Sequence, residues 1–151
     1  MEIIQLIKIE SSNPKVENSI AQFKKLIEIL NSKNLPENIV EKINSEISVL
    51  NSSEAIGNSF SHLLKKKQNA ITKLIEKELK LVPKNYYRNL WLVLGMTVFG
   101  LPLGLAFGLS IGNLGLLGIG LPVGMFIGLL VGSLLDKKAL ESGKQLEIEL
   151  K

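Results

Sequence analysis

Residues 90–135 contain no charged side chain, and glycine recurs through this run at nearly every fourth position. A single helix over these 46 residues would be roughly 70 Å long at about 1.5 Å per residue, whereas the hydrocarbon core of a bilayer is about 30 Å thick. The run therefore has to fold back on itself. Residues 112–115, GNLG, lie near its middle and are typical of a turn. We therefore predict a hairpin over residues 84–138, with two transmembrane spans at about 90–110 and 117–135.

Basic residues flank the predicted hairpin at both ends, and its turn carries no charge. Lys84 and Arg88 precede the first span. Lys137 and Lys138 follow the second. Because basic flanks of membrane spans are retained in the cytoplasm, we expect both termini to be cytoplasmic and the protein to lie in the cytoplasmic (inner) membrane. Aromatic residues at the start of the first span mark the expected headgroup level: Tyr86, Tyr87 and Trp91.

The two arms of the hairpin repeat one sequence. Residues 100–112 align without gaps on residues 120–132 and are identical at seven of thirteen positions, including four glycines and a proline. Glycines at four-residue intervals leave a groove along a membrane helix, and grooves allow two helix backbones to pack closely. The residues predicted to form such helix-packing faces are Gly95, Gly100, Gly104, Gly108, Gly112, Gly120, Gly124, Gly128 and Gly132.

A simple depth argument predicts which glycines meet. If the chain reverses near Leu114, residues whose numbers sum to about 228 lie at equal depth in the membrane. The resulting pairs are Gly108 with Gly120, Gly104 with Gly124, Gly100 with Gly128, and Gly95 with Gly132. Our hypothesis is that the two glycine faces meet within one hairpin. The alternative is that each face packs against a neighbouring copy of the chain.

Two prolines interrupt the spans. Pro102 lies inside the first span and leaves the carbonyl of Val98 without its helical N–H partner, so a bend is expected there. Pro102 is either a proline that neighbouring groups tolerate or a candidate hinge for gating. Pro122 falls near the first turn of the second span, where a missing N–H costs little.

Residues 1–83 alternate apolar and charged side chains and are predicted to form a cytoplasmic domain of amphipathic helices. Apolar residues recur at steps of three and four over residues 16–30, 39–50 and 56–75. The helix starts are predicted near Pro14, at Pro36 and after Ser53, with the third helix extending as far as Val82. Three such helices can bury one another, although a core of this size is marginal by itself.

The tail, residues 139–151, is predicted to be cytoplasmic. Residues 144–151, KQLEIELK, alternate apolar and charged side chains like a short strand, and LIKIE near the N-terminus has a similar pattern. The two chain ends could pair as strands, or the tail could be a frayed helix or coil. The predicted fold class is therefore all-α, with amphipathic helices, a transmembrane hairpin and at most short terminal strands.

Basic side chains are concentrated just before the hairpin, where residues 63–88 carry a net charge of +6. Five lysines there are spaced so that they would share one face of the third helix: Lys66, Lys73, Lys77, Lys80 and Lys84. A lysine face next to a bilayer suits anionic lipid headgroups, and a solvated helix face would show the same pattern. Nucleic acid is not an expected partner, because no aromatic side chains alternate with these lysines.

The residue types that catalysis requires are scarce. The chain has no cysteine, and its only histidine, His62, has no second metal ligand or nucleophile near it in the sequence. The glycine spacing lacks the lysine and hydroxyl residue of a nucleotide-binding loop. We therefore expect neither an enzyme nor a cofactor.

The tandem motifs GLPLGLAFGLSIG and GLPVGMFIGLLVG, the GN turn and the lysine-rich exit LDKKALESGKQL resemble the glycine-zipper two-span hairpins of small bacterial membrane proteins. The resemblance covers about residues 88–146 and implies the architecture only, because such hairpins occur in channels, envelope proteins and assembly factors alike. The expected function is a non-enzymatic membrane anchor or scaffold that self-associates or holds a protein partner through its helices. The alternatives are a homo-oligomeric pore and a membrane-disrupting toxin or defence effector.

Overall fold

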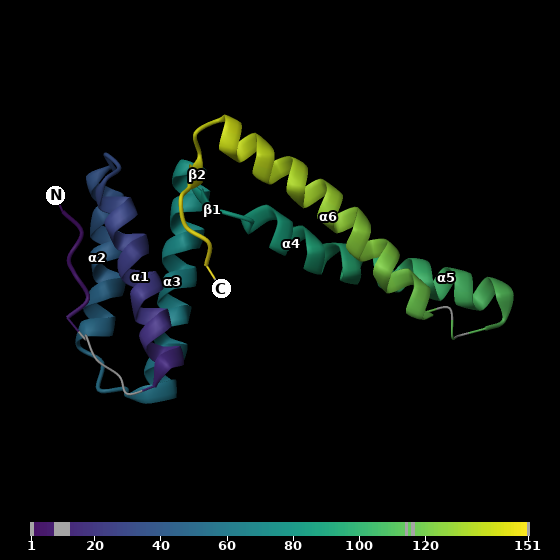
Figure 1. Ribbon diagram of the computed structural model, residues 1–151, viewed down its shortest axis with the longest axis horizontal. Helices are drawn as coiled ribbons and strands as arrows, with labels where there is room; N and C mark the ends of the chain where they lie inside the picture. The colour runs from purple at the N-terminus through teal and green to yellow at the C-terminus, as the bar shows by residue number, and fades with distance from the viewer. Residues whose placement is uncertain (1, 8–12, 114, 116, 151) are drawn as a thin grey trace. The chain divides into compact units, whose positions relative to one another are not determined.

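The structure is a computed structural model that describes residues 2–7, 13–113, 115 and 117–150 (Figure 1). The described chain is predominantly α-helical, which confirms the predicted all-α fold class. It divides into two compact units, which we describe separately. The helical unit comprises residues 1–82 and 146–150, and the hairpin unit comprises residues 83–145.

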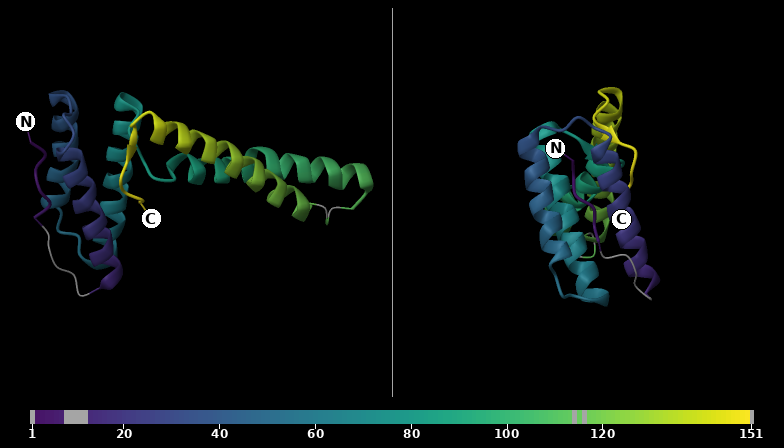
Figure 2. Two further views of the ribbon diagram at one scale, coloured as in Figure 1. Left: turned by 45° about the horizontal axis from the view of Figure 1, so that its top comes forward. Right: turned by 90° about the vertical axis from the view of Figure 1, so that its left-hand side faces the viewer.

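The described residues of the helical unit form three helices: α1 (Pro14–Asn31), α2 (Glu37–Asn51) and α3 (Gly57–Leu79). Helices α1 and α2 both pack against α3, as the two views of Figure 2 show. The side chain of Asn13 accepts a hydrogen bond of 3.0 Å from the Lys15 amide and so caps α1. The periodic apolar residues face inward, and Phe23, Leu26, Ile43 and Ile71 lie at the centre of the core.

The third helix is shorter than the sequence predicted. It begins at Gly57 rather than directly after Ser53, and it ends at Leu79 rather than near Val82. Lys80 adopts a left-handed conformation with φ of 58°, and the Leu81 amide then bonds to the Ile75 carbonyl at 3.3 Å. This bond pattern closes a helix C-terminus, so periodicity alone overestimated the length of α3.

Residues 8–10 of the predicted N-terminal strand lie outside the described part of the chain, and the described residues of the two chain ends do not pair with each other as strands. The short strand β2 (Gln145–Leu146) instead pairs with β1 (Val82–Pro83) in a two-stranded sheet. Residues 2–7 form no strand and lie along α1 and α2, where asparagine side chains hydrogen-bond to their backbone. These side-chain bonds take up the backbone groups that a strand partner would otherwise use.

The hairpin unit consists of two antiparallel helical arms. The first arm is α4 (Tyr86–Leu94), a π-helical turn η1 (Gly95–Gly100) and α5 (Leu101–Ile111). The second arm is α6 (Leu117–Glu141), which packs against α4, η1 and the first half of α5 (Figure 1).

The π-helical turn lies directly before Pro102. The amide of Leu101 bonds to the carbonyl of Met96, five residues back, rather than to that of Thr97. In a regular α-helix the proline ring would clash with the carbonyl of Val98, and a wider π-helical turn is a plain way to relieve such a clash. The sequence predicted a bend at Pro102 but gave no indication of this turn.

Candidate functional site

The closest approach between the two arms of the hairpin is lined by glycine on both sides. A Cβ atom placed on Gly120 would lie 2.5 Å from the Cα of Gly104, and one placed on Gly124 would lie 2.6 Å from the Cα of Gly100. Cβ atoms essentially never approach backbone atoms this closely, so no larger residue fits without separating the helices. The glycines whose added Cβ would meet backbone of the other arm are Gly95, Gly100, Gly120, Gly124, Gly128 and Gly132.

The register between the arms differs from the one that the depth argument predicted. Gly100 contacts Gly120 and Gly124, whereas the predicted partner was Gly128. Gly95 contacts Gly124 and Gly128 rather than Gly132. The contacts are thus displaced by one to two glycine steps along α6. The physical reason is visible in Figure 1, where the first turns of α6 lie beside the middle of α5 rather than beside its end.

The remaining predicted pairs are displaced in the same direction. Gly104 meets Gly120 instead of Gly124. Gly132 meets the backbone of Tyr87 and Arg88 at the start of α4, with its added Cβ 2.5 Å from the Cα of Arg88. Gly108 is buried in α5, but its predicted partner Gly120 contacts Gly100 and Gly104 instead.

Gly112 does not belong to the packing face. It ends α5 in a left-handed conformation with φ of 72°, and no atom of the described residues lies within 4 Å of a Cβ placed on it. The Asn113 amide bonds back to the Gly108 carbonyl at 2.9 Å, which is the bond pattern of a helix end. Gly112 therefore continues the four-residue spacing in the sequence but serves as a cap.

Asp136 extends the glycine series of α6 and was missed by the sequence analysis. Its carboxylate accepts hydrogen bonds from the amides of Tyr87 at 3.0 Å and Arg88 at 2.9 Å, and the residue is 8% exposed. Asn85, which precedes α4, does not cap that helix with its own side chain. An acceptor with negative charge at a helix N-terminus satisfies free amides and favours the helix dipole.

A signal for Asp136 was present in the sequence. Residues 120, 124, 128, 132 and 136 follow one another at four-residue steps, which is the spacing of a single helix face. Four of these positions are glycine and bring α6 against the first arm. Asp136 is the next residue on that face, so it lies opposite the start of α4. Its short carboxylate can reach the backbone amides there.

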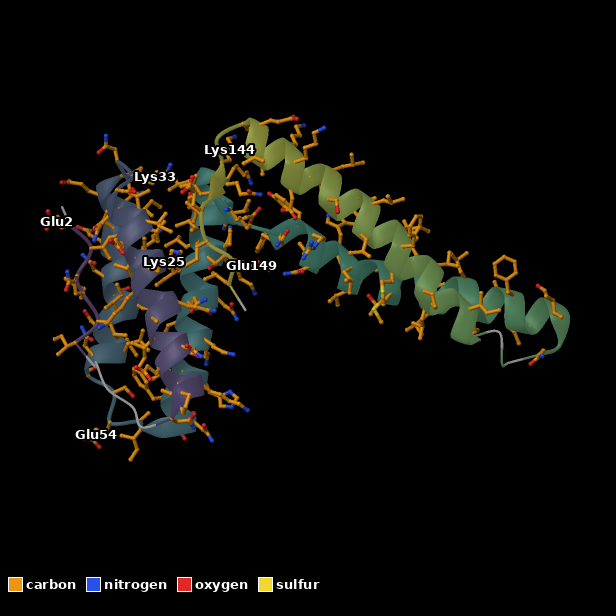
Figure 3. The ribbon with its side chains drawn as sticks, in the orientation of Figure 1. Glu2, Lys25, Lys33, Glu54, Lys144 and Glu149 are labelled. Atoms are coloured by element: carbon orange, nitrogen blue, oxygen red, sulfur yellow. The ribbon has the colours of Figure 1, made fainter. Side chains whose placement is uncertain are left out.

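The outward faces of both arms are apolar and exposed. Residues 86–111 and 118–141 each contain a stretch of 18 residues that is long and apolar enough to cross a membrane, and 22% of each stretch is buried. Figure 3 shows mostly carbon in the side chains along the middle of these arms, away from the start of α4 and the end of α6. Exposed apolar residues of this surface include Val98, Phe107, Leu109, Ile119, Phe126 and Leu130. An apolar surface this continuous is unfavourable in water and typical of contact with lipid or protein.

Two of the three hydroxyl side chains in the spans bond to their own helices, and the third, Ser133, is exposed on α6. The hydroxyl of Thr97 donates to the Val93 carbonyl at 2.9 Å, and that of Ser110 donates to the Ala106 carbonyl at 2.7 Å. Such bonds satisfy a hydroxyl without presenting it to a neighbour. Neither residue therefore contributes a polar stripe to the outer surface.

The predicted lysine face is interrupted. Lys66, Lys73 and Lys77 are exposed on α3, but Lys80 is the left-handed residue that ends the helix and Lys84 lies beyond β1. The five lysines therefore do not lie on one helix face, because α3 stops before the last two.

A smaller cluster of basic side chains lies within the helical unit. Lys73 and Lys77 line, with Lys42 of α2, a hollow of about 330 Å³. Glu46 also borders this hollow, and its carboxylate pairs with Lys67 at 2.6 Å. Because the Glu46 carboxylate is paired with Lys67, it does not neutralise the three lysines that line the hollow, and the hollow has a net positive charge.

The residues predicted for the membrane interface lie at the open end of the hairpin. Tyr86 and Tyr87 contact edge to face, with ring centroids 5.3 Å apart, and Arg88 and Trp91 follow on α4, half-buried. Lys137 and Lys138 are exposed near the end of α6. The structure thus places these residues around the point where the two arms join the rest of the chain.

Among the described residues, no group of three or more histidine, cysteine, aspartate or glutamate side chains could hold a metal ion. Comparison of the chain with protein-family models, curated proteins and solved structures found no match. Its function therefore has to be argued from the geometry of the two units.

Proposed function

We propose that the protein is a non-enzymatic integral membrane protein that acts as an anchor or scaffold, with the hairpin fixing the helical unit to a bilayer. The observation that carries this proposal is the glycine-lined contact between the two arms. It closes the hairpin on itself and leaves apolar side chains over the outward faces. In such a hairpin the backbone N–H and C=O groups form hydrogen bonds within the helices, and the outward side chains contact lipid.

The connections of the hairpin support a topology with both flanks on one side of the membrane. The first arm follows β1 and the second arm leads into β2, and these two strands pair. Leu146, the last residue of β2, and Ile148 beyond it are buried in the core of the helical unit. A chain that leaves and re-enters one water-facing unit has to enter and leave the bilayer on the same side. The basic flanks favour the cytoplasmic side of a bacterial inner membrane.

The anchor is favoured over a pore by the position of the glycine faces. They pack against each other within one hairpin, so they are not available to line a channel between hairpins. Thr97 and Ser110 bond to their own helices. A conducting path needs polar groups or backbone carbonyls along its wall. The described outward faces of this hairpin are mostly apolar, with single hydroxyls such as that of Ser133 and no polar stripe.

Lipids with anionic headgroups are part of the proposal. Lys84, Lys137 and Lys138 are exposed at the open end of the hairpin, where the headgroups of a surrounding bilayer would lie. Each basic residue near an anionic surface contributes about 1 kcal/mol of attraction. Self-association or a protein partner would then involve the helical unit, because the hairpin is already closed.

Reconstitution into liposomes tests the anchor against the alternatives. We expect the protein to remain with the lipid during alkaline carbonate extraction and to leave potassium flux at the level of protein-free liposomes. Leu130→Lys, on the outward face of α6, should reduce the inserted fraction at least tenfold, because a charge inside the bilayer costs about 3 kcal/mol. Ser142→Lys lies beyond α6 and serves as the matched control.

Two outcomes would contradict the proposed function. Extraction of the intact protein by carbonate would mean that the hairpin does not span the membrane. Flux that rises with protein concentration would favour a pore or a membrane-disrupting effector over an anchor.

A further inference from the structure

The N-terminal segment, residues 2–7, is held to the helical unit by asparagine side chains. The Asn44 amide group donates to the Glu2 carbonyl at 3.2 Å and accepts from the Ile4 amide at 2.9 Å. Asn51 repeats the arrangement one step along, donating to the Gln5 carbonyl at 3.1 Å and accepting from the Ile7 amide at 3.0 Å. Both asparagines come from α2, along which the segment runs in Figure 1.

A third asparagine holds the segment from α1. Asn31 accepts from the Ile3 amide at 3.0 Å and donates to the Ile3 carbonyl at 3.4 Å. Every one of these bonds joins an asparagine side chain to a backbone atom of the segment. They therefore recognise an extended backbone and do not depend on which side chains it carries.

The spacing of the asparagines matches that of an extended chain. Asn44 and Asn51 are two helical turns apart on α2, a rise of roughly 10 Å. The amides that they hold, those of Ile4 and Ile7, are three residues apart, which also spans roughly 10 Å in an extended backbone. The hydrogen bonds of Asn44 and those of Asn51 therefore match the spacing of the backbone groups in the segment, as in a site built for an extended peptide.

The side chains of the segment follow a period of three. Ile3 and Leu6 are each 4% exposed and enter the core, whereas Ile4 and Ile7 are 40% and 73% exposed. A period of three is that of a polyproline II helix, while a strand has a period of two. The site thus has two apolar anchor positions, separated by two residues that face solvent.

The two anchor side chains leave space beside them. A hollow of about 300 Å³ adjoins Leu6 and is bordered by Lys24, Ile27 and Glu28. A second hollow, of about 460 Å³, adjoins Ile3 and is bordered by the apolar Leu30 and Val40 and by polar residues that include Asn34. Glu2 and Lys33 also border the second hollow, and Figure 3 shows both at this end of the helical unit. Larger apolar side chains at the anchor positions would bury more surface than isoleucine and leucine do.

We propose that the groove along α1 and α2 is a peptide-binding site whose built-in occupant is the segment 2–7. Its external ligand is an extended segment of a partner protein that carries two large apolar side chains three residues apart. The tethered occupant has the advantage of a high effective concentration, and the external ligand offsets this advantage by filling the two hollows. The proposal names the kind of partner that the scaffold would hold, and in that respect it rests on the proposed function.

Peptide binding to the full-length protein in detergent micelles tests this proposal. The probes are two fluorescent, acetylated and amidated hexapeptides: EIIQLI, which copies residues 2–7, and EFIQFI, with phenylalanine at both anchor positions. The double variant Ile3→Asp/Leu6→Asp expels the built-in occupant. We expect this variant to bind EIIQLI at least tenfold more tightly than the intact protein does, and the intact protein to bind EFIQFI at least tenfold more tightly than EIIQLI.

The asparagines provide the matched control. In the Ile3→Asp/Leu6→Asp background, Asn44→Ala/Asn51→Ala should weaken peptide binding at least tenfold, because it removes the hydrogen bonds from both asparagines to the peptide backbone. Asn38→Ala, an exposed asparagine on the same helix, should leave binding within twofold. The proposal would be overturned if Asn44→Ala/Asn51→Ala left the affinity for the peptide unchanged. It would also be overturned if a folded Ile3→Asp/Leu6→Asp variant bound neither peptide.

A second measurement does not depend on the folding of the double variant. Because the chain has no cysteine, a single Leu6→Cys thiol reports release of the segment through its alkylation rate. We expect this rate to exceed that of Leu26→Cys, in the core of α1, at least tenfold and to rise further with EFIQFI. Equal rates, or no effect of the peptide, would overturn the proposal.

Two further outcomes distinguish this inference from exchange of the segment between copies and from the proposed anchor function. A dimer of the intact protein that is lost in Ile3→Asp/Leu6→Asp would overturn it in favour of segment exchange between copies. Peptide binding in micelles does not require membrane insertion. A protein that stays in liposomes without flux but fails to bind either peptide would therefore contradict this inference alone.

Discussion

Replacing Gly128 by alanine is expected to lower the free energy of unfolding of the hairpin by about 3 kcal/mol. The carbonyl oxygen of Trp91 occupies the position that the new Cβ would take, and the Cα of Gly95 lies 3.2 Å from it. Both neighbours are backbone atoms of the first arm, so no side chain can rotate away. The arms would have to separate, and the neighbouring glycine contacts would be lost with this one.

Trp91 makes this prediction directly measurable. It is the only tryptophan in the chain and lies at the contact itself, so its emission during titration with dodecyl sulfate reports the opening of the hairpin. The control is Gly118→Ala on the same helix, where no atom of the described residues lies within 4 Å of the added Cβ. That variant should change the free energy of unfolding by less than about 0.5 kcal/mol. Equal losses in the two variants would mean that the glycine contact does not hold the arms together.

Replacing Asp136 by alanine is expected to lower the free energy of unfolding of the hairpin by about 2 kcal/mol, because partly buried amides lose their acceptor. The amides concerned are those of Tyr87 and Arg88 at the start of α4. Asp136→Asn should give an intermediate loss, since its amide group has a single acceptor oxygen.

The same dodecyl sulfate titration measures this loss, and hydrogen exchange of the Tyr87 and Arg88 amides should become faster in Asp136→Ala. Glu141→Ala is the control, because Glu141 lies on the same helix in an exposed pair with Lys137 at 3.9 Å. Such pairs contribute less than about 1 kcal/mol. A loss in Asp136→Ala no larger than in Glu141→Ala would contradict the role of Asp136 as the cap of α4.

The helices of both units follow from periodicity and composition. The apolar steps over residues 16–30 and 39–50 predict α1 and α2, because one face of each helix has to be buried. The length of the uncharged run predicts two apolar helices, because a single helix of that length would exceed the thickness of a bilayer. These predictions depend on patterns of many residues, so single exceptions do not disturb them.

Features set by one residue or by tertiary contact could not be predicted in the same way. The left-handed conformation of Lys80 ends α3 early, although lysine is not a residue that usually adopts it. The register of the hairpin depends on where α6 begins beside α5, which glycine spacing alone does not determine because the pattern repeats every four residues. A shift by one repeat preserves glycine contact, and so the sequence was equally compatible with both registers.

The asparagine contacts to residues 2–7 illustrate the same limit. Asn31, Asn44 and Asn51 are unremarkable in the sequence, and their common role emerges only when α1 and α2 lie side by side along one extended segment. Asp136 is a different case. Its four-residue distance from Gly132 was present in the sequence and could have indicated that it faces the first arm.

We propose that the hairpin crosses the membrane and that both of its flanks lie on one side. The most direct test uses three single-cysteine variants of this cysteine-free chain: Glu54→Cys in the helical unit, Lys144→Cys after α6, and Asn113→Cys after α5. A membrane-impermeant maleimide is applied to sealed vesicles of known orientation. We expect Glu54→Cys and Lys144→Cys to be labelled from the same side and Asn113→Cys to be labelled only from the other. Labelling of all three cysteines from one side, with the membrane intact, would contradict this proposal.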